Sequence, residues 1–149
     1  MQIHLEGSTK IATTRDRAFY LLTNPSFLAG TIPDAEEVTV LDSATLEARI
    51  KVRVAVVSST IRMRMTIGEK QPPTRAKLIA EGTGSGSSLK ISSLFMLEGD
   101  SPVTMTWATD ADLSGVMAGL GSTLLKSFAS KKVGEIFGGI TAAIERAPR

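Results

Sequence analysis

The C-terminal quarter of the chain, residues 113–146, most restricts what the sequence can fold into. Apolar residues recur there every three or four positions, the spacing of one face of an α-helix. A helix over the whole range would be roughly 50 Å long at ~1.5 Å per residue, so it needs a large surface to pack on. We expect one continuous helix with Asp112 as its N-cap, Asp110 being the alternative.

This segment is also rich in glycine, which is less favourable than alanine in a helix by up to ~1 kcal/mol per residue. Gly115 and Gly119 would fall one turn apart on the same face, where they either allow close packing or leave room for a ligand. For Gly134, Gly138 and Gly139 we expect a close approach of the helix to a sheet, or a bend. The lysines and glutamates in the segment exclude a membrane-spanning helix.

Most of the preceding chain alternates between apolar and polar residues, as half-buried strands do. Thr13 and Asp16 predict a capping box that opens a short helix ending before Pro25, followed by a helical turn at 26–29. We expect strands at 2–11, around Val38 and Val40, and at 45–57, 60–68, 74–82, 89–97 and 103–109. Short turns between strands favour antiparallel pairing. The fold class is therefore α+β: a single domain, 1–149, with a curved seven-stranded antiparallel sheet wrapped around the long helix and two short helices between strands one and two.

Composition excludes several classes of function. The chain has no cysteine and a net charge of only +2, with one Trp and one Tyr. These counts argue against thiol chemistry, cysteine metal sites and nucleic-acid binding. The start of the chain has no signal-peptide pattern, so we expect a cytoplasmic protein.

Catalytic candidates are few. The single histidine, His4, falls on the polar side of the first strand and has no second histidine or cysteine for a metal site. Gly82, Gly84 and Gly86 form a weak phosphate-binding pattern that is better explained as a mobile hairpin loop. We expect no enzyme activity, no metal and no catalytic residue. An enzyme would have to use Thr109, Ser114 or Tyr20.

Three segments resemble the CoxG family, which takes its name from a component of carbon monoxide dehydrogenase, within the Bet v 1/START-like superfamily. They are GSTKIATTRDRAFYLLTNPSFLAGTIPDAEEV (7–38), EGTGSG (81–86) and TMTWATDADLSGVMAGLGSTLL (104–125). The most specific parts are Asn24-Pro25, Ile32-Pro33 and Trp107 with the segment 115–125; Asp34 departs from the family, which usually has glycine there. The resemblance implies a helix-grip fold. It also implies an accessory protein that handles a quinone or a lipid beside a molybdenum hydroxylase at the membrane.

The side chains expected to face inward carry no charge, and together they could line an apolar cavity between helix and sheet. Methionine suits such a site because its flexible thioether adapts to different shapes. The alternatives are a filled core, which would make the protein a docking component without a ligand, and a cyclase or dehydratase on the same fold. No cofactor is expected beyond a bound quinone or lipid. The predicted ligand-binding residues are Phe27, Leu28, Val54, Met63, Met65, Leu78, Phe95, Met105, Trp107, Val116, Met117, Gly119, Leu120, Leu124 and Phe128.

Two further expectations concern the route by which a ligand enters the cavity and the charge on the outer face of the sheet. The segments 27–34 and 82–88 contain glycine or proline, and we expect one of them to open for the ligand. Alternation also places a set of basic residues on the outer face of the sheet: Arg49, Lys51, Arg53, Arg62, Arg64, Arg75 and Lys77. This face either keeps the sheet soluble or attracts an acidic partner or the anionic inner face of a membrane.

Overall fold

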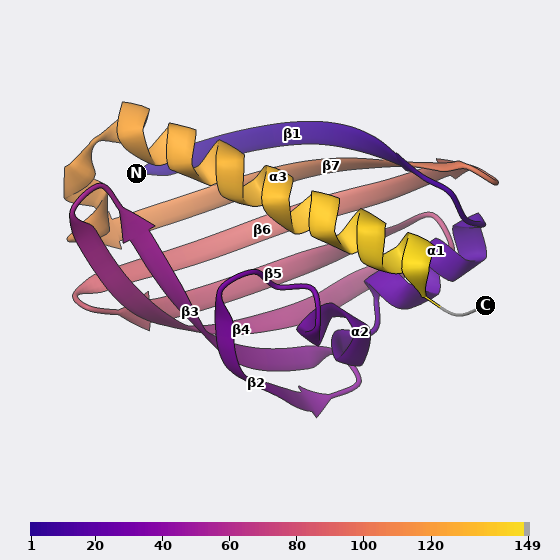
Figure 1. Ribbon diagram of the computed structural model, residues 1–149, viewed down its shortest axis with the longest axis horizontal. Helices are drawn as coiled ribbons and strands as arrows, with labels where there is room; N and C mark the ends of the chain where they lie inside the picture. Colours follow the sequence, from indigo (N-terminus) through magenta and orange to yellow (C-terminus); the bar gives the residue numbers. More distant parts are fainter. Residues whose placement is uncertain (148–149) are drawn as a thin grey trace.

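Seven antiparallel strands form one curved sheet, and a long helix near the C-terminus crosses its face (Figure 1). The computed structural model describes residues 1–147. The strands lie in the order β1-β7-β6-β5-β4-β3-β2, so the first strand pairs with the last one. The elements are β1 (Gln2–Ile11), α1 (Arg15–Leu22), α2 (Pro25–Ala29), β2 (Ala35–Asp42), β3 (Thr45–Val54), β4 (Val57–Gln71), β5 (Arg75–Gly84), β6 (Ser87–Gly99), β7 (Val103–Gly115), the 3₁₀ helix η1 (Met117–Leu120) and α3 (Ser122–Arg146). This architecture confirms the predicted fold class. Within the described residues, no helix is long and apolar enough to cross a membrane.

The predicted start of the long helix is wrong. Residues up to Gly115 extend β7, where they pair with β1 on one side and β6 on the other, and α3 begins only at Ser122. Gly115 and Gly121 have φ angles of 88° and 94°, which end the strand and precede the helix. Asp110 and Asp112 are consequently strand residues, not N-caps.

Other boundaries also differ from the sequence prediction. The strand expected at 45–57 ends at Val54, because Ala55 (φ 54°) and Val56 form the turn to β4. The loop expected at 82–88 is mostly paired strand, joined by a turn at Ser85 and Gly86. The N-cap of α1 is Thr14, whose side chain accepts a hydrogen bond from the backbone N–H of Arg17.

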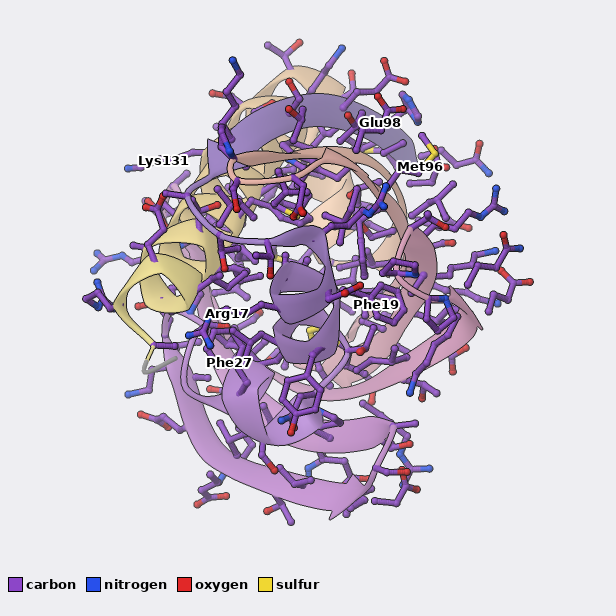
Figure 2. All side chains as sticks on the ribbon, turned by 90° about the vertical axis from the view of Figure 1, so that its right-hand side faces the viewer. Arg17, Phe19, Phe27, Met96, Glu98 and Lys131 are labelled. Carbon is purple, nitrogen blue, oxygen red and sulfur yellow. The ribbon has the colours of Figure 1, made fainter. Side chains whose placement is uncertain are left out.

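Two clusters of buried side chains hold the helices on the sheet. The larger cluster joins α1, α2 and the second half of α3 to the sheet and includes contacts between Phe19 and Phe95 and between Trp107 and Phe137. Figure 2 shows Phe19 on the sheet side of α1. The smaller cluster, which includes Leu125, joins the first turns of α3 to the opposite end of the sheet.

Candidate ligand cavity

A largely apolar cavity of about 280 Å³ lies between α3 and the concave face of the sheet. Its floor consists of the inward residues of several strands. Three of these residues, Ala48, Ala80 and Ala111, have small side chains that leave space between the sheet and α3. On the other side α3 contributes Phe128 and Ala129. The size is close to the lower end of the ~300–1,000 Å³ typical of small-molecule sites.

Six of the predicted ligand-binding residues line this cavity: Leu28, Met63, Met65, Leu78, Met117 and Phe128. The others do not. Phe95, Met105 and Trp107 are packed in the larger cluster with Phe27 against it, and Val54 and Leu120 belong to or pack on the smaller cluster. For the strand residues Val54, Phe95, Met105 and Trp107 the alternation identified the face correctly, but the space above them is already filled.

The expected inward positions of Val116, Gly119 and Leu124 are wrong. Val116 is 58% exposed and Leu124 is 40% exposed. Gly119 lies exposed in η1, and a Cβ added there would meet nothing within 4 Å. Gly115 does not make room for a ligand either, since a Cβ there would lie 2.1 Å from the carbonyl oxygen of Gly86. Gly115, Val116 and Gly119 lie before α3, outside the continuous helix that the sequence predicts, whereas Leu124 lies in α3 on a face turned to solvent.

Sequence reasoning missed a buried hydroxyl residue in the cavity, Ser93 on β6. It lies beside Thr109 on β7, which from the sequence is a candidate only for an enzyme. Their hydroxyl oxygens lie 2.8 Å apart, and both residues are buried. Alternation along both strands was the signal that could have placed this pair inward.

Three charged residues that line the cavity, Asp34, Lys51 and Lys132, have partly exposed side chains, and we call this group the mouth. The Lys132 ammonium donates a hydrogen bond to Asp34 Oδ2 at 2.6 Å and one to Glu135 Oε2 at 3.3 Å. The hydrogen bond to Asp34 is the main cause of a raised Lys132 pKa, so this lysine is charged at neutral pH. The Lys51 backbone N–H donates to the Asp34 carbonyl at 3.2 Å. Together these bonds hold the segment after α2 against β3 and α3.

The remaining polar candidates do not converge on this site. Tyr20 is 66% exposed, and Ser114 pairs with Ser88 at an exposed position. His4 is exposed, with Nδ1 2.6 Å from Asp110 Oδ1; the hydrogen bond to Asp110, followed by one to Glu6, raises the pKa of His4. No group of three or more metal-binding side chains exists among residues 1–147.

The outer face of the sheet is less basic than alternation indicated. Glutamates pair with four of the seven predicted residues, as Arg49 with Glu37, Lys51 with Glu36, Arg64 with Glu47, and Lys77 with Glu69. Three of these glutamates were missed because they lie on β2 or beyond the predicted end of β4. Within residues 1–147, Arg53, Arg62 and Arg75 make no ion pair, so they remain the free positive charges of this set.

Comparisons with known proteins agree with this architecture. The family model that describes CoxG, the G component of carbon monoxide dehydrogenase, matches residues 7–145. A conserved protein from Geobacillus kaustophilus is similar in structure, with a TM-score of 0.84 and 20% identity over 95% of both chains.

Two further solved structures have the same fold. One is the Zhui aromatase/cyclase from Streptomyces sp. R1128, with a TM-score of 0.68 and 16% identity over 98% of this chain and 95% of that one. The other is a START superfamily protein from Mycobacterium smegmatis, with a TM-score of 0.69 and 9% identity over 96% and 97%. No curated protein sequence matches. These structures confirm the predicted helix-grip fold.

Proposed function

The chain belongs to the CoxG family, and from that premise we propose that it carries a hydrophobic molecule, a quinone or a lipid, for a carbon monoxide dehydrogenase-type molybdenum hydroxylase. The observation that supports this proposal is the cavity, whose charged lining residues among 1–147, Asp34, Lys51 and Lys132, are all partly exposed rather than buried in it. Burying ~300 Å² of apolar ligand surface contributes about 7 kcal/mol at ~25 cal/mol/Å², before the costs of ordering. Micromolar binding corresponds to about 8 kcal/mol, so little polar contact is required.

A cavity-filling substitution tests whether the ligand occupies this space. Ala111 lies on the cavity floor, and Ala108 lies on the outer face of the same strand. We expect Ala111→Phe to weaken binding of 2-methyl-1,4-naphthoquinone or of a dansylated fatty acid at least tenfold, because the ring fills the site. Ala108→Phe is the matched control and should bind as the parent does. Equal binding by the two variants would place the site elsewhere.

Two measurements distinguish a quinone from a lipid as the ligand: which of the two probes binds, and mass spectrometry of the apolar compound extracted from purified protein.

The accessory role is tested by mixing the hydroxylase with quinone-containing vesicles. The parent protein should accelerate reduction of the quinone, and Ala111→Phe should not. Equal rates with and without the parent would remove the accessory role. Chemical conversion of the added compound by the protein alone would instead indicate an enzyme.

A further inference from the structure

The hydroxyl pair in the cavity, Ser93 and Thr109, lies in an otherwise apolar row of the sheet. The two residues face each other in register on β6 and β7. Their partners on the next strands are Leu5 on β1 and Leu78 on β5. Both hydroxyl residues are more than nine-tenths buried. Within this row the pair is therefore the one polar point among apolar side chains, while the buried hydroxyl of Ser87, elsewhere in the lining, accepts a hydrogen bond from the backbone N–H of Met117.

Along β6 and β7 the pair also marks the end of the cavity. Two residues further along the same strands toward the core, Phe95 and Trp107 are part of the packed cluster and do not line the cavity. Two residues in the other direction, Ile91 and Ala111 do line it. A molecule that fills the space thus contacts the hydroxyl pair.

The two hydroxyl groups have one more proton than their mutual hydrogen bond uses. Each hydroxyl supplies one O–H donor and two acceptor positions. The hydrogen bond between Ser93 and Thr109 uses one of the two protons, and within residues 1–147 neither side chain makes another hydrogen bond. One O–H is left without an acceptor at a buried site, where an unmade hydrogen bond costs free energy.

We propose that this remaining O–H donates a hydrogen bond to a carbonyl oxygen of the bound molecule. The cavity then selects apolar compounds that carry a carbonyl, such as quinones, ketones and esters, over hydrocarbons of the same shape. A carbonyl suits the pair because it accepts a hydrogen bond and brings no proton that needs a second partner. The inference rests on the proposed function, since it requires a ligand in this cavity.

The test compares 9-fluorenone with fluorene, which differ by a carbonyl in place of a methylene group. The parent should bind fluorenone about tenfold more tightly than fluorene. A double variant, Ser93→Ala with Thr109→Val, removes both protons and should bind the two compounds about equally. Both residues are changed together because either single variant leaves one hydroxyl with a free proton. The matched control, Ser92→Ala with Thr106→Val, changes the outer face of the same two strands and should keep the preference.

Infrared spectroscopy gives a second measurement that does not depend on the variants folding. The carbonyl stretch of fluorenone bound to the parent should lie at a lower frequency than in an apolar solvent, as hydrogen bonding requires. An unshifted stretch in the parent, or an unchanged preference in the double variant, would overturn this inference while leaving the carrier proposal standing. If neither compound bound the parent, both would fail.

Discussion

At the scale of single residues, the glycines of this chain serve opposite purposes. Gly7 pairs in register with Trp107, and a Cβ on it would lie 2.2 Å from the indole ring. The indole in turn stacks on Phe137 of α3 with ring centroids 4.5 Å apart. Gly138, by contrast, is an exposed helical residue with nothing within 4 Å of an added Cβ. The expected close approach to the sheet is therefore wrong for Gly138, as it is for Gly134.

Two alanine substitutions should consequently change stability in opposite directions. Gly7→Ala should destabilise the fold by ~1–3 kcal/mol, because overpacking must displace the indole and its stacking on α3. Gly138→Ala should stabilise it by ~0.5–1 kcal/mol through helix propensity. Urea unfolding followed by fluorescence of the single tryptophan measures both free energies. A neutral Gly7→Ala would mean that Trp107 does not lie over the β1 backbone.

At the scale of elements, the segment between α2 and β2 is the candidate gate. The other expected gate, 82–88, is held as paired strands. Asp34 ends the remaining segment with φ at 60°, a left-handed conformation that explains why glycine suits this position in the family. The bond from Lys132 to Asp34 fastens this segment to α3.

Weakening that bond should speed the opening of the mouth. Asp34→Asn tolerates the left-handed backbone but removes the charge that holds Lys132. Because both side chains are partly exposed, we expect at most ~1 kcal/mol of lost stability. Amide exchange across 30–35 and the association rate of 2-methyl-1,4-naphthoquinone should both increase severalfold. Glu36→Gln breaks only the outer ion pair with Lys51 and is the control. Identical rates in Asp34→Asn and the parent would exclude this gate.

At the scale of the whole molecule, the two broad faces carry different charge arrangements. Figure 2 shows Met96 on the sheet side and Lys131 on the helix side. On the sheet side Arg62 and Arg75 project from β4 and β5 without an ion pair among residues 1–147. On the helix side Lys126 and Lys131 are exposed. We propose that the sheet face gives the carrier its attraction to an anionic membrane.

Charge reversal on each face tests which one meets the membrane. A basic residue near an anionic membrane contributes about 1 kcal/mol, decaying over a Debye length of ~8 Å at physiological salt. Arg62→Glu with Arg75→Glu should therefore weaken co-sedimentation with phosphatidylserine vesicles at least tenfold at low salt. Lys126→Glu with Lys131→Glu has the same charge change and should have a smaller effect. Equal losses would assign the attraction to net charge, and no loss in either would leave the sheet face as a solvated surface.

The sequence by itself determined the antiparallel pairing of strands joined by short turns and the face of most strand residues. A period of two, interrupted by short turns, allows only antiparallel neighbours, and it placed Met63, Met65 and Leu78 on the concave side. It could not place the end of β7, because the apolar spacing of 113–120 also fits a helix. Only pairing with β1 and β6, together with the backbone at Gly115 and Gly121, resolved this ambiguity.

The tertiary structure alone decided which inward residues line a cavity and which fill a core. Trp107 and Thr109 are two residues apart on the same face, yet the first is covered by Phe137 and the second faces open space. Alternation fixes a direction, but the space in that direction depends on side chains of distant elements, above all α3. The same reason explains the charge of the outer face. Glutamates from β2 and the end of β4 form ion pairs with basic residues that look unpaired when each strand's sequence is considered alone.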